Sequence, residues 1–465
     1  MKFKVPHSYS IIFGLIIIMG ILTWVLPSGQ YQRKFDDHTN QSLIIPNTYH
    51  VVDSKPQGLQ DILMSLLHGF VSAAEIIGFI LIVGGAYGVI IRTGAIDRAL
   101  HSAIKKLGSK IKILIVMLLF LFALAGSTIG TLEETIPFYL IMVTIMISLG
   151  YDAIIGIAVI FLGATTGNMA STLNPFATGV ASAIANVDLR DALSERIIYW
   201  AISITITISY VLYYAIKVKK HPEKSLIADL RKEHYNHFIN HDKSTIEEKK
   251  ISEAKFSFSD KIVVFSLLAL LVTMIYGIVQ LEWWMAEISA LFLGFAFLTL
   301  IVKRINENDF WDGFVNGARD IMPATIVIAL AKGIVVIATN GSIIDTILYN
   351  SANFLGGLSK ELFIVLDLVL EFFIAFLVPS SSGHAALTMS ILPPLADLFE
   401  IPKSAVITSY QISTGLANMV TPTSGVLMVA LSVARVPWGR WVRFVTPLMG
   451  IHFLTAIVFL IYTIY

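Results

Sequence analysis

Long apolar runs dominate the chain, and their lengths set the first expectation about its structure. They recur from Ile11 to the C-terminus, and many reach the eighteen or more residues that a helix needs to cross the hydrocarbon core of a bilayer. The first run, residues 10–26, lacks a small-residue cleavage site and leads into further spans, so we expect a retained helix rather than a signal peptide. The pattern predicts an all-α polytopic membrane protein.

Two of these runs are too long for one helix and are interrupted by small polar residues. The first run, about 111–150, is broken at 126–135, and the second, about 362–399, is broken at 379–384. Basic residues place both flanks of the first run in the cytoplasm, whereas both flanks of the second face outside. We therefore expect two re-entrant hairpins that enter from opposite sides, since irregular backbone at that depth needs protein or a watery cavity around it. Two complete spans joined by a surface turn remain the alternative.

Each hairpin is followed by a span with a break near its middle. The broken helices are expected at about 153–185 and about 404–432, with breaks at 167–175 and 415–425. Proline removes a backbone donor there and glycine loosens the helix, so carbonyl and amide groups are freed. With Asn, Ser and Thr side chains, these groups can hold a polar ligand or an ion. A packing kink lined with small residues is the alternative.

The matching segments belong to a repeat with an offset of about 244 to 248 residues. Residues 69–71 (GFV) recur at 313–315, and the Asn174-Pro175 pair corresponds to Thr421-Pro422. Threading the chain through its basic loops puts the N-terminus in the cytoplasm and the C-terminus outside, and it inverts one half relative to the other. Parallel repeats are the alternative. We expect a first transmembrane half at 1–216, a cytoplasmic linker at 217–260 and a second half at 261–465.

Composition supports the membrane assignment and excludes several function classes. Of 465 residues, 56% are apolar and 14% are charged, whereas soluble domains carry about a quarter charged residues. A net charge of +1 argues against nucleic-acid binding, and the absence of cysteine excludes disulfides and thiolate chemistry. We find no phosphate loop, paired-histidine metal motif or nucleophile elbow. We expect no enzyme, no cofactor and no metal, and any uphill transport must be driven by ions or by exchange. A channel or a membrane receptor is the alternative from another class.

Charged residues inside the membrane are the strongest candidates for function. Glu133 and Glu134 lie at the first hairpin tip, where a carboxylate costs about 2.5–3.5 kcal/mol unless a cation, a proton or water compensates. His384 lies at the other tip, and Lys332 is either a counter-ion or an interfacial residue. Asp367 and Glu371 stay outside the expected site because their depth does not follow from the pattern. The expected substrate-binding residues are Ser127, Thr128, Thr131, Glu133, Glu134, Thr135, Asn168, Thr172, Asn174, Ser381, Ser382, Gly383, His384, Asn418, Thr421, Thr423 and Ser424.

These segments resemble the YfcC-type group, which belongs with the dicarboxylate anaerobic carriers of the ion transporter superfamily. The resemblance implies a bacterial inner-membrane homodimer with a scaffold domain and a moving transport domain, an elevator mechanism, in which substrate lies between hairpin tips and broken helices. The motifs that carry it are GSTIGTLEETIPFY (126–139), STLNPFATGVA (171–181), PSSSGHAALTMSILPPLADL (379–398), NMVTPTSGVLM (418–428) and TWVLPSGQY (23–31).

The resemblance points to two substrate classes. The family name indicates dicarboxylates, whereas members of this group are also assigned as arginine/ornithine antiporters, and Glu133-Glu134 favours a cationic amino acid. Many members have an acidic residue where Thr414 stands and glutamine where His384 stands. The loss of that carboxylate favours exchange over sodium symport. The expectation is a cationic amino-acid antiporter, and the alternative is a sodium- or proton-coupled symporter of dicarboxylates or related carboxylates.

Overall fold

The computed structural model of the chain describes residues 8–36, 41–95, 98, 111–240, 257–281, 283 and 285–465. Within these ranges, eight helical segments are long and apolar enough to cross a membrane. The chain is a multi-pass, all-α membrane protein, as its apolar runs predict. Three expectations lie outside the described residues: the cytoplasmic N-terminus at Lys2 and Lys4, the basic residues Lys105, Lys106 and Lys110, and the middle of the linker at 241–256.

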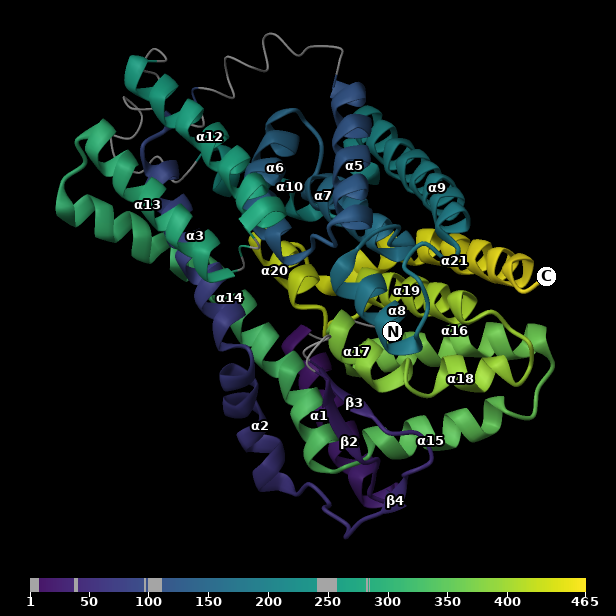
Figure 1. Cartoon of the computed structure of the whole chain (residues 1–465). Helices are drawn as coiled ribbons and strands as arrows, with labels where there is room; N and C mark the ends of the chain where they lie inside the picture. Colours follow the sequence, from purple (N-terminus) through teal and green to yellow (C-terminus); the bar gives the residue numbers. More distant parts are fainter. Residues whose placement is uncertain are drawn as a thin grey trace.

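One group of helices is built around the longest helix, α14 (Glu307–Asn340), which passes through Pro323 without ending. Close backbone approach explains the packing: a Cβ atom on Gly88 would lie 2.1 Å from the carbonyl oxygen of Gly313, and one on Gly317 would lie 2.2 Å from that of Gly84. Only glycine allows two helices to come this near. The group also comprises α1 (Ser8–Val25), α2 (Leu59–Ser72), α3 (Ala74–Arg92), α12 (Phe258–Leu281) and α13 (Met285–Lys303) (Figure 1).

Short strands follow α1 and cover one end of this group. Arg33, on one of these strands, has its Nη2 atom 2.7 Å from Oδ1 of Asp345 in α15 (Ile344–Leu355). The backbone N–H of Tyr31 donates to the other oxygen of the same carboxylate at 2.9 Å. These contacts fix the strands to the segment that follows α14. The antiparallel pairs are β1 (Gly29–Gln30) with β4 (His50–Val51) and β2 (Arg33–Asp36) with β3 (Gln41–Ile44).

The second group begins with a helical hairpin and a broken helix. The helical hairpin occupies 111–148 and the broken helix 153–185, where the expected ranges were about 111–150 and about 153–185. The break in the hairpin is shorter than predicted, because the helix continues through Gly126 and Ser127 to Thr128, where Gly126 packs against the backbone of Ala164. The elements are α5 (Ile111–Thr128), η2 (Glu133–Thr135), α6 (Ile136–Ser148), α7 (Ala153–Ala170), η3 (Pro175–Gly179), α8 (Val180–Ala185) and α9 (Leu193–Lys220).

The same order of elements follows in the second part of the chain. Here the prediction of an irregular stretch at 379–384 is wrong for 381–384, because Ser380 caps a helix that begins at Ser381. The next break occupies only 421–424, since its helix continues to Val420. The elements are α16 (Lys360–Leu377), α17 (Ser381–Thr388), α18 (Leu392–Asp397), α19 (Lys403–Val420), α20 (Gly425–Val433) and α21 (Trp438–Thr463).

The described part of the linker is ordered and packs against the second group. Arg440, at the start of α21, donates to the carbonyl oxygen of Leu226 at 2.8 Å and to Asp229 at 3.0 Å. The linker therefore joins the two parts of the chain by contacts as well as by sequence. Its short helices are η4 (Pro222–Lys224), η5 (Ala228–Leu230), α10 (Arg231–Tyr235) and η6 (Asn236–Asn240).

Candidate functional site

The two broken helices cross next to their breaks. A Cβ atom on Gly415 of α19 would lie 2.5 Å from Cβ of Met169 in α7, so glycine is what permits the contact. The hairpins complete the arrangement: α17 packs against η3 and α8, and α6 packs against α20 (Figure 1). Each hairpin thus contacts the shorter part of the other broken helix. Segments that are far apart in sequence meet where helical hydrogen bonding is interrupted.

The first hairpin tip is fastened to the first break. The Ser127 hydroxyl lies 2.9 Å from Thr172 Oγ1 and accepts from the Thr172 N–H at 3.1 Å, while the Ser127 carbonyl accepts from the Leu173 N–H at 3.1 Å. Gly130 has φ +82°, and a Cβ there would lie 2.4 Å from Asn174 Oδ1. A residue other than glycine would suffer both backbone strain and a clash at this position.

Inside the first break, Asn174 supplies the missing hydrogen bonds. Its Oδ1 accepts from the N–H groups of Phe176 and Ala177, at 3.0 and 3.2 Å, and its Nδ2 donates to Asn168 Oδ1 at 2.9 Å. Ser171 has φ 44°, and the Thr178 hydroxyl lies 2.8 Å from its carbonyl oxygen and 2.7 Å from its Oγ. Asn168 and Asn174 therefore hold the break together.

The two glutamates of the first tip occupy different surroundings. Glu134 is 7% exposed, and its Oε2 accepts from the Leu132 N–H at 3.1 Å. Glu133 is half-buried, and Lys332 of α14 lies close enough for their opposite charges to interact. Within the described ranges, neither glutamate forms a direct ion pair. Lys332 therefore belongs to the surroundings of the tip.

Other polar side chains of this tip differ in how they are satisfied. The Thr135 hydroxyl lies 2.8 Å from the Tyr139 hydroxyl and 2.5 Å from the Leu132 carbonyl oxygen. Thr128 donates back to the Leu124 carbonyl. Thr131 is buried, and its hydroxyl has no hydrogen-bond partner among the described residues. Thr131 is therefore the member of this set that is free to bind a ligand.

Two tryptophans donate hydrogen bonds to the free carbonyl groups at the end of α19. The sequence pattern does not reveal these contacts. Trp438 Nε1 donates to the Val420 carbonyl and Trp441 Nε1 to the Met419 carbonyl, both at 2.9 Å. The expectation that carbonyls freed at this break would face a ligand is wrong for these two. Thr423 donates to the Phe376 carbonyl at 2.8 Å and so joins the break to α16.

The remaining polar residues of the second break differ: among the described residues, Thr421 bonds within the break, whereas the side chains of Asn418 and Ser424 do not. Thr421 Oγ1 lies 2.7 Å from Thr423 Oγ1 and accepts from the Thr423 N–H. Asn418 is 6% exposed in the last turn of α19, and Ser424, 5% exposed, precedes α20. Buried polar side chains without a protein partner at a helix break are suited to bind a polar ligand.

The second hairpin tip pairs His384, an expected site residue, with Glu371, which the sequence pattern did not place in the site. His384 is fully buried; its Nε2 forms a short contact with Glu371 of α16, and its Nδ1 lies 3.2 Å from Thr414 Oγ1. Tyr410 stacks edge-on against the imidazole ring and donates to the Ser381 carbonyl at 2.6 Å. Ser382 and Gly383 are half-buried in the same first turn of α17. The spacing of Asp367 and Glu371, four residues apart, could have predicted that both face one side of this arm.

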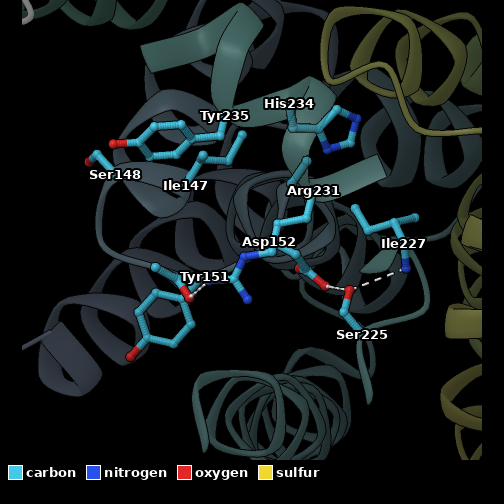
Figure 2. A pocket seen from close by; sticks show the side chains of 11 residues that line it. Ile147, Ser148, Tyr151, Asp152, Ser225, Ile227, Arg231, His234 and Tyr235 are labelled. Atoms are coloured by element: carbon cyan, nitrogen blue, oxygen red, sulfur yellow. Dashed lines mark hydrogen bonds between the residues drawn. The ribbon is translucent and has the colours of Figure 1, made fainter. Parts of the chain in front are cut away.

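A separate cavity of about 120 Å³ lies between α6, α7 and the linker (Figure 2). Asp152, the N-cap of α7, accepts from Ser225 Oγ at 2.6 Å and from the Tyr214 hydroxyl at 2.8 Å. Burial raises the pKa of Asp152, and these hydrogen bonds offset part of that shift. The cavity is about 28 Å from the first break, counting 1.5 Å of helix rise per residue from Asp152 to Ser171. It is therefore distinct from the site at the breaks.

Comparison of the sequence with known proteins identifies a transporter family. The sequence model of the family described as C4-dicarboxylate anaerobic carrier, DcuC, matches residues 5–465. An uncharacterized protein of Haemophilus influenzae is 30% identical over 500 residues, covering 99% of this chain and 97% of the relative. The Escherichia coli protein named "Putative basic amino acid antiporter YfcC" is 29% identical, covering 99% of this chain and 96% of its own.

Two solved transporter structures also align over nearly the full length. The Alcanivorax borkumensis YdaH transporter gives a TM-score of 0.40 at 15% identity, covering 98% of each chain. Neisseria gonorrhoeae MtrF, described as one of a class of antimetabolite efflux pumps, gives 0.38 at 17% identity, covering 98% of this chain and 95% of its own. TM-scores this low do not establish a shared fold. The family match does not depend on them, and it covers nearly all of the sequence: the chain is a membrane transporter, not an enzyme, and belongs to the C4-dicarboxylate anaerobic carrier (DcuC) family.

Proposed function

We propose that the chain is a secondary antiporter of cationic amino acids, of the arginine/ornithine type. The observation that carries the proposal is the Glu133-Glu134 pair at the first tip, with Lys332 as the nearby cation and no direct ion pair among the described residues. One carboxylate charge is thus left over for a substrate. A guanidinium or ammonium group is the complement that a partly buried carboxylate requires.

The polar groups near the breaks complete the proposed binding site. The α-carboxylate of an amino acid accepts hydrogen bonds, and hydroxyl and amide donors near the breaks can supply them. We assign this role to Thr131, Asn418 and Ser424, which the described residues leave without a side-chain partner. Two other pairs hold the tip and the break in position: Ser127 bonds to Thr172, and Asn174 bonds to Asn168.

The order of elements supports two inverted repeats. In each half a long helical segment, a hairpin and a broken helix follow each other, and α7 and α19 are both 18 residues long with a break directly after them. With the two hairpins entering from opposite sides, the meeting of their tips with the broken helices puts the site near the bilayer centre. We assign the domains as 1–216, 217–260 and 261–465.

The proposed transport mechanism is of the elevator type, in an inner-membrane homodimer. The structure offers a natural division: the helices around α14 form one group, and the hairpins with the broken helices form the other. The first would act as scaffold and the second as transport domain. Contacts at the two ends of the molecule agree with a cytoplasmic linker and an external C-terminus, because Tyr465 bonds to Glu361 at one end while Arg440 meets Asp229 at the other.

The competing function is proton- or sodium-coupled symport of dicarboxylates. It is favoured by the family description and by Lys332, whose charge would attract a carboxylate. The name of the Escherichia coli relative favours basic amino acids instead. Both substrate classes fit a break lined with hydroxyl and amide groups, so the charges of Glu133, Glu134 and Lys332 decide between them.

A counterflow experiment tests the proposal directly. Purified protein is reconstituted into liposomes loaded with ornithine, and uptake of labelled arginine is followed without a sodium or pH gradient. We expect uptake that depends on internal ornithine and is competed by external lysine-like cations, with succinate-loaded liposomes as the control. Exchange of dicarboxylates but not of arginine would refute the proposal and support the symporter.

A further inference from the structure

Three titratable side chains are buried together where α16, α17 and α19 meet. Asp367 and Glu371 stand one helical turn apart on α16, and His384 faces them from α17; all three are 0% exposed. Glu371 Oε2 contacts His384 Nε2, whereas Glu371 Oε1 has no partner among the described residues. Both carboxylate oxygens of Asp367 are also without a hydrogen-bond partner in that set.

Counting charges in this cluster leaves one negative charge too many. A protonated His384 neutralises only one carboxylate, and that carboxylate is Glu371, which His384 contacts directly. An ionised Asp367 would then be an unpaired charge in the buried interior, which costs far more than the few kcal/mol of an unpaired neutral group. A proton on Asp367 removes this charge and creates an O–H group, which can donate a hydrogen bond to the unpaired Glu371 Oε1.

Among the described residues, the helices packed against α16 supply no other compensating charge. From α19, Ser409 and Tyr410 face the carboxylates, and both are neutral hydroxyl groups. The helices α14, α15 and α21 also pack against α16. In the described ranges they bring no charged side chain into hydrogen-bond contact with Asp367 or Glu371. His384 is thus the one cation that the described contacts give to the cluster.

We propose that Asp367, Glu371 and His384 form a proton-binding site of the carrier, separate from the Glu133-Glu134 site. The proton comes from water, joins the Asp367 carboxylate and leaves by the same route. The route is short: Ser380 at the tip is exposed, and His384 lies one turn below it. A bound metal ion fits less well, because no three such side chains in the described residues are arranged to hold one.

The inference rests on the proposed function for its role in transport. Exchange of one substrate for another can proceed with the proton held in place throughout the cycle. In the proposed cycle of net transport, the carrier that returns without substrate takes up the proton on one side and releases it on the other. The site would therefore allow exchange without a proton gradient and couple net flux to protons.

The test uses Asp367→Asn in the full-length protein, since the amide resembles the protonated carboxyl in shape. The matched control is Glu361→Gln, a solvent-accessible carboxylate at the start of the same helix. Infrared spectroscopy of the purified protein should show a band from a protonated buried carboxyl group. We expect Asp367→Asn to remove this band and Glu361→Gln to retain it. Absence of the band in the unmodified protein at neutral pH overturns the proposal whatever the substrate is.

Transport measurements distinguish this inference from the proposed function. In liposomes with a trapped pH dye, substrate-driven proton movement should fall to the level of empty liposomes in Asp367→Asn, while arginine/ornithine counterflow persists. Proton movement equal to that of the unmodified protein in this variant would refute the proton site and leave the exchanger intact. Loss of the band in Asp367→Asn without any arginine exchange by the unmodified protein would support the proton site and refute the substrate assignment.

Discussion

The charges around the first tip make a prediction whose sign depends on the substrate. Glu134 is 7% exposed and has a single backbone donor, so most of its charge is available to a ligand. A hydrogen bond to a charged group contributes about 1.5–3 kcal/mol. At 1.4 kcal/mol per factor of ten, Glu134→Gln should weaken binding of arginine by about 10- to 150-fold.

Glu133 should behave differently because Lys332 faces it. Glu133→Gln removes one attraction and leaves the lysine charge uncompensated next to the substrate. We expect a loss at least as large as for Glu134→Gln. Lys332→Gln should have the opposite effect and strengthen arginine binding, by about the 0.2–1 kcal/mol typical of a screened charge pair.

Isothermal titration calorimetry with the purified protein measures these affinities, and counterflow measures the same ranking in liposomes. Glu195→Gln, at the start of α9, serves as the control because its side chain lies outside both breaks. If the glutamine variants bind arginine unchanged, or bind a dicarboxylate more tightly while Lys332→Gln loses it, the cationic-substrate reasoning is refuted. Because the substitutions should change the affinities for arginine and for a dicarboxylate in opposite directions, the measured signs distinguish the two substrate classes.

Other predictions concern packing, the tip and the linker. Gly167→Ala should destabilise the protein by about 1–3 kcal/mol, because its Cβ would lie 2.0 Å from a backbone carbonyl oxygen of the facing helix. The control is Gly450→Ala inside α21, where a Cβ meets nothing within 4 Å; it should not lower the melting temperature and should raise it slightly, because alanine favours the helix. Ser127→Ala should cost about 1–3 kcal/mol of stability, since the buried Thr172 N–H loses its acceptor, and thermal unfolding in detergent measures it. His234 Nε2 of the linker lies 3.1 Å from the Arg435 carbonyl oxygen. Burial lowers the pKa of His234, so the unfolded linker binds more protons than the folded one, and the packing of the linker against this carbonyl should weaken as pH falls below about 6.5. Trypsin cleavage near the linker, normalised to cleavage of a denatured substrate at each pH, should rise on acidification, and His234→Gln should abolish that pH dependence.

The elements of the fold follow closely from the sequence, because apolar length and broken runs are local properties. The hairpin at 111–148 and the broken helix at 153–185 lie within two residues of the predicted ranges. The breaks were harder to place. Small polar residues such as those at 381–384 were expected to be irregular, but Ser380 caps a helix there. Three consecutive serines occupy 380–382, and each is a residue type that can cap a helix, so the sequence does not decide which of them does.

The site was predictable in its segments but not in its partners. Glu133, Glu134 and His384 stand out because charge is rare in apolar sequence. Their partners come from elsewhere in the chain: Lys332 lies about 200 residues from Glu133, and Trp441 of α21 donates to a carbonyl at the end of α19. Such pairings depend on how helices pack, and the sequence pattern of each helix does not encode them.

The central claim is that both tips meet the broken helices in one water-accessible cleft that binds the substrate. The chain has no cysteine, so Thr131→Cys and Ser382→Cys place one thiol at each tip. We predict that a small, charged thiol reagent modifies both positions and that arginine slows both reactions. The contradicting result is rapid modification of each thiol from a single membrane face, at a rate that neither arginine nor any dicarboxylate changes. It would show that the two tips are surface loops.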